Sequence, residues 1–413
     1  MLSRRSSSGS TSSSFGRYWA ASAISSFGTA ITDVALPVLV VQLLGASAAE
    51  FGVVRAAQFL PYALLGLIVG VYVDRWRRKP ILMWSSIGRA LSLGAIVVLW
   101  MSDALHIWTL VVLLLLFGSF SVFGFAATQS LLPRLVPRER LVVANSRLDQ
   151  TDAAAQTLGP ALGGGLVGLL GAPVAIAVDA VSYLVDAALI GSLKLDEPKR
   201  ARSERDLRAE IREGLGFMYR HRVLAPLAIS THVWFIANGA AMTVLALLVL
   251  RTLGFSPFGF SMLLTVLGVA TLVGASIAPV LGTRLGSGRA VVLARALYPF
   301  AWILVVAAPP TPFGTVLLFI AVGLQGLSMG AENANEAGLW QTLAPDEVLG
   351  RVNATRRSVN RTMAAAGALL AGVAAGFADE RLVLIGVIVL FAAAVFVVWR
   401  SPLRERPAQR EGE

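Results

Sequence analysis

Residues 107–129 read IWTLVVLLLLFGSFSVFGFAATQ, an apolar stretch without a charged side chain. A helix of this length crosses the roughly 30 Å hydrocarbon core of a bilayer, because it rises about 1.5 Å per residue. Hydrophobic residues make up 56% of the chain and charged residues 14%. A soluble domain carries about a quarter charged residues. The stretch therefore predicts a membrane-spanning helix in a membrane protein.

Similar apolar stretches recur along the chain and predict twelve spans of an all-α membrane protein. The expected spans are residues 17–43, 50–73, 80–101, 107–129, 146–170, 173–193, 224–250, 258–282, 289–308, 313–337, 359–377 and 382–399. The longest connection between spans divides them into two groups of six. The expected parts are a disordered N-terminus at 1–16, six-helix bundles at 17–193 and 224–400, a linker at 194–223 and a cytoplasmic tail at 401–413.

The 35 lysine and arginine residues are distributed unevenly between the two sides that these spans define. Arg251 and Arg381 alone fall on one side, and four more arginines lie inside spans or at their ends. The others fall on the opposite side, as the positive-inside rule predicts when both termini are cytoplasmic. The net charge of +11 thus indicates topology in the cell membrane, and no nucleic-acid partner is expected.

The chain lacks the residues that several functional classes of protein require. There is no cysteine and there are three histidines, so no metal site is expected. The phosphate-binding pattern G-x-x-x-x-G-K-[ST] is absent, which argues against an ATP-driven pump. We expect no enzyme activity, no cofactor and no obligatory protein partner.

The two halves of the chain repeat each other in sequence. PRERLVVAN at 137–145 aligns with PDEVLGRVN at 345–353, and the same offset places Gly159 on Gly367. Transporters built from related bundles show such repeats and bind their substrates between the halves, near the bilayer midplane.

The linker contains apolar residues at helical spacing, among them Leu207, Ile211, Leu215 and Met218. This pattern predicts an amphipathic helix on the cytoplasmic face. A solvated linker helix is favoured over a regulatory site.

The loop after the second span, residues 70–80, reads GVYVDRWRRKP. Gly70 allows close helix approach. Asp74 can pair with Arg75 or Arg78, or with the positive N-terminus of a helix from the other half. We expect these four residues to form a cytoplasmic gate, and the alternative is a plain positive-inside loop.

This loop resembles the signature G-x-x-x-D-R-x-G-R-[RK] of the major facilitator superfamily, with Arg77 where many members have glycine. The arginine-rich variant is similar to the subgroup of macrolide, siderophore and multidrug exporters. The resemblance implies twelve transmembrane helices in two six-helix bundles and secondary transport by alternating access around a central cavity.

The fifth span contains GPALGG, with Gly159, Pro160, Gly163 and Gly164. It is similar to the core of a motif in the drug–proton antiporters of the superfamily. Proline bends a helix and glycines permit tight packing, so we expect a conformational hinge. Generic small-residue packing is the alternative.

Inserting an ionisable side chain at the middle of a span costs about 2.5–3.5 kcal/mol. We therefore expect such residues to serve a function or a specific pairing. We expect Asp33 to be the leading proton carrier, with Arg89 adjusting its proton affinity. Asp186, Arg295 and Glu332 are further candidates for proton coupling or for lining the substrate cavity. The alternative is a set of static ion pairs.

Three other polar residues are interpreted more simply. Asp179 lies near the outer boundary and is interpreted as a hydrated helix cap. Trp340 lies near a span end and is assigned to the interfacial aromatic belt. His232 is either a polar core residue or part of a cavity lining.

The predicted function is export of a small amphipathic molecule, a drug-like compound or a secondary metabolite, by proton antiport. The expected partners are this substrate, protons and the lipid bilayer. Alternatives are a siderophore or metabolite exporter or a uniporter of the same fold, and a non-transporting membrane sensor.

Overall fold

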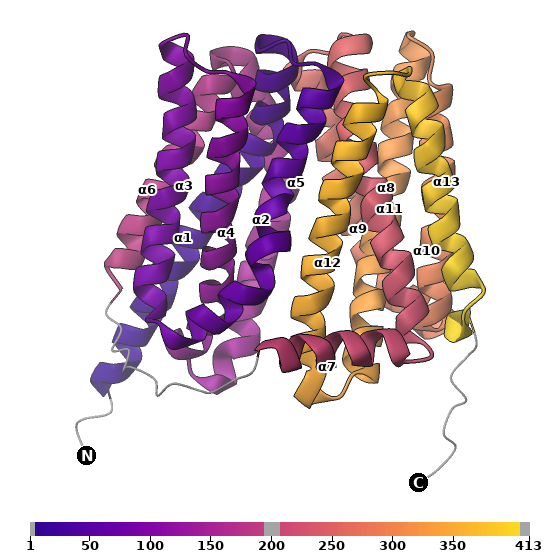
Figure 1. Ribbon diagram of the computed structural model, residues 1–413. Coiled ribbons are helices and arrows are strands. Elements are labelled where there is room, and N and C mark those ends of the chain that lie inside the picture. Colours follow the sequence, from indigo (N-terminus) through magenta and orange to yellow (C-terminus); the bar gives the residue numbers. More distant parts are fainter. Residues whose placement is uncertain (1–4, 194–206, 405–413) are drawn as a thin grey trace. The chain divides into compact units, whose positions relative to one another are not determined.

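The computed structural model describes residues 5–193 and 207–404, although not every side chain within them. In these ranges the chain is helical and forms no strand (Figure 1). The α-helices are α1 (Arg5–Val38), α2 (Ala48–Arg75), α3 (Arg78–Met101), α4 (Ile107–Leu135), α5 (Leu141–Leu170), α6 (Ala172–Gly191), α7 (Leu207–Arg220), α8 (Leu224–Leu247), α9 (Pro257–Leu285), α10 (Ser287–Ala307), α11 (Pro312–Leu343), α12 (Asp346–Ala374) and α13 (Glu380–Trp399).

Every α-helix except α7 is long enough to be a span. Within the described part of the chain, 10 of them are also apolar enough to cross a membrane. The other two long helices are α2 and α12. A helix satisfies its backbone hydrogen bonds internally, which a chain in lipid requires. The predicted all-α membrane fold is confirmed.

The first compact unit contains α1 to α6, together with Val249–Thr265. In this unit α1 packs on α5 and α6, while α3 packs on α4 and α6. The short segment joins the unit through Gln42, whose side-chain amide donates to the carbonyl oxygen of Phe255 at 3.2 Å. The unit therefore includes part of a loop that the sequence assigns to the second bundle.

The second unit contains Arg208–Leu248 and the chain from Val266 onward. Here α8 packs on α12 and α13, while α10 packs on α11 and α13. Helix α7 lies across the ends of α8 and α12 (Figure 1) and pairs with α12 through Glu213 and Arg351. It occupies the region where the sequence predicts an amphipathic helix.

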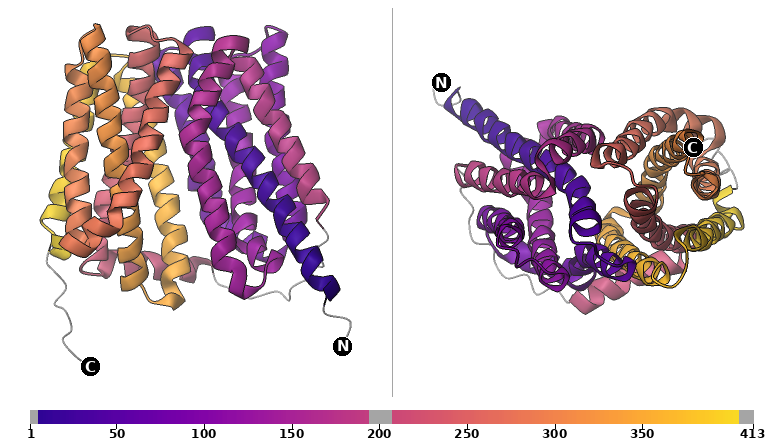
Figure 2. Two further views of the ribbon diagram at one scale, coloured as in Figure 1. Left: turned by 180° about the vertical axis from the view of Figure 1, so that it is seen from behind. Right: turned by 90° about the horizontal axis from the view of Figure 1, so that it is seen from above.

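Each unit is a bundle of long helices (Figure 2), and the two units repeat the same packing order. Their first helices also end alike, in the π-helical segments Leu39–Leu43 and Leu248–Thr252. Gly45 and Gly254 follow with φ of 61° and 64°, a left-handed conformation that favours glycine. The repeat seen in the sequence thus extends to backbone detail.

The N-terminus differs from the sequence prediction. Helix α1 begins at Arg5, within the stretch 1–16 that was expected to be disordered. Adding a residue to an existing helix needs no new nucleus, so a long span can extend into a serine-rich segment. Residues 1–4, 194–206 and 405–413 lie outside the described chain, and with them parts of the predicted linker and tail.

Candidate functional site

Arg89 on α3 is held against α6 in the first unit. Its guanidinium carbon lies 4.2 Å from the ring centroid of Tyr183, a cation–π contact. Its Nη2 donates to the hydroxyl of Ser86 at 3.0 Å. The Tyr183 hydroxyl in turn shares a 2.7 Å hydrogen bond with Thr29 of α1. Three helices therefore fix this arginine and its aromatic partner.

Asp179 on α6 is fully buried. Its Oδ2 accepts a hydrogen bond from Thr32 of α1 at 2.6 Å, and its Oδ1 accepts one from Ser182 at 3.0 Å. Gly28 of α1 leaves room for this contact, because a Cβ there would collide with Asp179 and Ser182. The prediction of a hydrated cap is wrong, because the close approach of α1 covers this turn of α6.

Asp186 lies two turns further along α6 and is also buried. It accepts a short hydrogen bond from Ser86 of α3, the hydroxyl that Arg89 also contacts. Arg89 interacts electrostatically with both Asp179 and Asp186. In the first unit, one arginine thus interacts with two buried carboxylates.

Asp33 on α1 is exposed, in contrast to the α6 carboxylates. It interacts electrostatically with Arg55 of α2. The sequence instead predicts that Arg89 acts on Asp33. Because α3 packs directly on α6, Arg89 is directed toward the α6 carboxylates.

Arg295 on α10 forms the centre of a second cluster, in the second unit. Its side chain is 1% exposed. Its Nε lies 2.6 Å from Glu332 and its Nη2 lies 2.8 Å from Glu336, both on α11. The two glutamates share one helix face because they are four residues apart. Ser230 of α8 accepts a hydrogen bond from Nη1, and Thr231 accepts one from Nη2.

Glu336 has two further partners that the sequence analysis did not identify. Arg356 of α12 pairs with it at 3.2 Å, and the indole N–H of Trp340 donates to it at 3.1 Å. Arg356 also lies over the Trp340 ring, 4.7 Å from its centroid. Trp340 is 1% exposed, so its assignment to the interfacial belt is wrong. Helix α11 continues to Leu343, which places this turn in the packed end of the unit.

Four buried polar atoms of the second unit have no hydrogen bond of good geometry among the described residues, although the Tyr298 hydroxyl lies close enough to Glu332 and Trp234 to interact with both. The four atoms are Glu332 Oε2, the Tyr298 hydroxyl, Trp234 Nε1 and Trp302 Nε1. The rings of Trp234 and Tyr298 meet edge to face at 5.6 Å. A buried polar atom without a partner is costly, so the Tyr298 hydroxyl is expected to turn toward Glu332, with which it interacts.

His232 on α8 connects α7 to α12. Its Nδ1 lies 2.7 Å from the amide oxygen of Asn360, which can only accept, so Nδ1 carries the proton. Its Nε2 then accepts a 2.8 Å hydrogen bond from the Tyr219 hydroxyl of α7. Burial raises the pKa of Tyr219, which keeps that hydroxyl protonated. Of the two interpretations, this geometry fits the polar core residue.

The side chains of three predicted gate residues, Gly70, Asp74 and Arg75, lie outside the described part of the chain. Arg78, the fourth, begins α3 and is buried. The gate therefore stays a prediction.

The predicted hinge glycines lie at helix contacts. Gly159 packs on Ala30 of α1, and Gly163 lies on the backbone of Ile31. Gly164 packs on Ser261 at the start of α9, and Pro160 is buried within a continuous α5. The glycines thus serve helix packing, and a hinge movement stays a prediction.

Tyr183 is the site residue that the sequence could have identified. Asp179, Tyr183 and Asp186 follow a spacing of four and three residues, which places them on one helix face. Arg356 and Thr231 carry no comparable signal, because their partners lie on other helices.

Two repeated units of long apolar helices, each with buried charged residues, define a polytopic membrane protein. The family match and the relatives below show a membrane transporter of the major facilitator superfamily, and therefore a transporter and not an enzyme. The chain belongs to the family described as transmembrane secretion effector, which it matches over residues 9–411.

Two curated relatives cover most of the chain. The chain is 30% identical over 356 residues to the multidrug efflux pump Tap of Mycolicibacterium fortuitum, covering 84% of this chain and 85% of that protein. It is 24% identical over 367 residues to macrolide efflux protein A of Streptococcus pyogenes, covering 88% of each.

Solved structures of other transporters have the same fold as this chain. The nucleoside transporter NupG has a TM-score of 0.74 at 12% identity, covering 95% of this chain and 100% of that one. A bacterial homologue of the iron transporter ferroportin, in an inward-facing state, has a TM-score of 0.73 at 16% identity, covering 95% and 99%.

Proposed function

We propose that this transporter exports a small amphipathic molecule, either a drug-like compound or a secondary metabolite. The names of its relatives, a multidrug efflux pump and a macrolide efflux protein, support this direction and substrate class. We place the protein in the cytoplasmic membrane with both termini inside the cell, on the basis of the lysine and arginine distribution.

Export is coupled to inward proton movement in this proposal. The observation that supports this coupling is the excess of acids over arginines inside the spans of the first unit. Asp33 interacts with Arg55, whereas Asp179 and Asp186 interact with Arg89. A carboxylate inside a span is costly when ionised and can exchange its proton for a substrate.

Asp33 is the proposed carrier because it is an acid inside the first span that interacts with Arg55 and is not enclosed by the bundle. Glu332 is the second candidate, because it is a buried acid inside α11 and lies beside Arg295.

Transport in proteoliposomes tests the coupling. The purified protein is reconstituted with an internal pH indicator, and a lipophilic cation, a macrolide and a siderophore are added in turn. We expect at least one of them to drive proton movement. Asp33→Asn reduces that movement to the level of empty liposomes, whereas Asp103→Asn, an exposed position at the end of α3, leaves it unchanged.

Other outcomes favour the alternatives. Substrate movement without proton movement indicates a uniporter, and movement of the siderophore alone indicates a narrower exporter. If no compound moves and deletion changes no efflux, a non-transporting sensor is favoured. Full coupling in Asp33→Asn contradicts the role of Asp33, and Glu332→Gln then becomes the decisive variant.

A further inference from the structure

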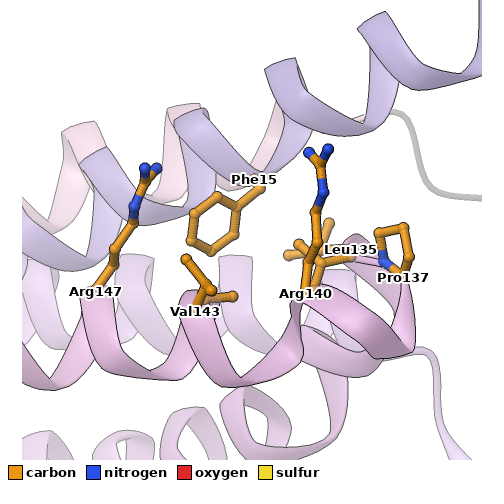
Figure 3. Close-up of a pocket in the computed structure, with 8 residues that line it drawn as sticks. Phe15, Leu135, Pro137, Arg140, Val143 and Arg147 are labelled. Carbon is orange, nitrogen blue, oxygen red and sulfur yellow. The ribbon is translucent and has the colours of Figure 1, made fainter.

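A pocket lies in the first unit between α1, the end of α4 and the start of α5 (Figure 3). Its volume is about 240 Å³. The lining residues are Phe15, Leu135, Val136, Pro137, Arg140, Val143, Ala144 and Arg147. The lining is therefore apolar except for two arginines.

The side chains of Arg140, just before α5, and Arg147, on α5, point to the same side, with the ring of Phe15 between them (Figure 3). Arg140 precedes the helix and Arg147 follows two turns later, so they share one face about 10 Å apart along the axis. Both are exposed, and none of the lining residues is acidic. The pocket thus combines an apolar floor with a positive rim.

The pocket lies where two membrane helices end. Helix α4 ends at Leu135 and α5 begins at Leu141, on the side where the lysines and arginines of the chain gather. Beside it, Val142 is 76% exposed and Val143 is 56% exposed. Exposed valines next to exposed arginines fit the boundary between acyl chains and headgroups.

The volume restricts the occupant. Sites for whole drug-sized ligands measure roughly 300–1,000 Å³, so this pocket holds only part of such a molecule. A phospholipid fits this condition, because its chains remain in the bilayer while its phosphate and nearest methylenes enter the pocket. Guanidinium groups bind phosphate with strong, charge-assisted hydrogen bonds.

We propose that this pocket is a binding site for an anionic phospholipid. Arg140 and Arg147 bind the phosphate, and the glycerol and first methylenes pack on Phe15 and Val143. The site is independent of the proposed export, so it can be tested without a transport assay.

Native mass spectrometry of the full chain tests the charges, with phosphatidylglycerol and phosphatidylcholine as probes. We expect phosphatidylglycerol to be retained in preference. The double variant Arg140→Ala/Arg147→Ala should weaken phosphatidylglycerol binding about 30-fold. Each basic residue contributes about 1 kcal/mol to binding, and about 1.4 kcal/mol corresponds to a tenfold change in affinity. The control Arg212→Ala/Arg220→Ala removes the same amount of charge from exposed positions of α7 and should weaken binding much less, because these arginines line no pocket.

A matched pair of variants tests the pocket itself. Val143→Trp fills the pocket and keeps both arginines, so it should weaken phosphatidylglycerol binding, whereas Val142→Trp, on the adjacent exposed residue, should not. Equal behaviour of the two variants overturns the proposal, because the lipid would then bind by surface charge alone. Complete displacement by millimolar inorganic phosphate overturns it in favour of a free-anion site. An unchanged double arginine variant overturns it as well.

Discussion

At the level of single residues, Arg295 makes side-chain contacts with four partners inside the second unit: Glu332, Glu336, Ser230 and Thr231. A fully buried charge is tolerated only when it is paired and hydrogen-bonded. Arg295 thereby pairs with two buried carboxylates, one of which it shares with Arg356, and it joins α8, α10 and α11.

We predict that Arg295→Met destabilises the protein by about 3–5 kcal/mol, because it leaves the buried Glu332 without a cation and Glu336 with Arg356 alone. Unfolding in detergent, followed by tryptophan fluorescence, measures this change. Adding Glu332→Gln to the variant should recover part of the loss, since one unpaired charge is removed. A loss no greater than that of Arg212→Met, an exposed position on α7, contradicts the prediction.

At the level of elements, glycines determine how closely α1 and α5 approach. A Cβ on Gly163 would lie 3.0 Å from the Cα of Ile31, a backbone atom that cannot turn away. A Cβ on Gly165, on the same helix, would have no neighbour within 4 Å. Substitutions at these two positions therefore distinguish the effect of close helix packing on stability from the effect of helix propensity.

We predict that Gly163→Val destabilises the first unit by about 1–3 kcal/mol more than Gly165→Val. Both changes alter intrinsic helix propensity equally, so the difference reports the α1–α5 contact. Thermal unfolding of the two variants in the same detergent provides the comparison. Equal midpoints mean that α1 can move away from α5 at little cost.

At the level of the whole molecule, the two halves share a scaffold but differ in their charges. Each half places an arginine on its third helix, Arg89 on α3 and Arg295 on α10. The neighbouring acids come from α6 in the first half and from α11 in the second. The repeated fold thus supports two different charged clusters.

We predict the sidedness of the chain from its basic residues. Because the chain has no cysteine, single cysteines report access without interference. Ser102→Cys, between α3 and α4, should react with a membrane-impermeant maleimide added to intact cells. Thr283→Cys, near the end of α9, should react only after the membrane is opened. The reverse pattern contradicts the proposed topology, and the cysteine-free parent is the control.

The amino-acid sequence was sufficient to predict the spans, the repeat and the unequal distribution of charge. Hydrophobic length and loop charge are local properties, and a bilayer converts them into topology with little ambiguity. The sequence also identified Asp186, Arg295 and Glu332, because an ionisable residue inside an apolar stretch is conspicuous.

Which of these charges meet depends on the packing of the helices in three dimensions. Packing turned Arg89 toward Asp186 on α6, buried Trp340 beside Glu336, and brought Arg356 to the same carboxylate. These pairings depend on the rotation of each helix about its own axis, which is set by side-chain packing and small-residue contacts. Because spans such as α6 and α11 are apolar over most of their surface, the hydrophobic pattern along the chain says little about that rotation.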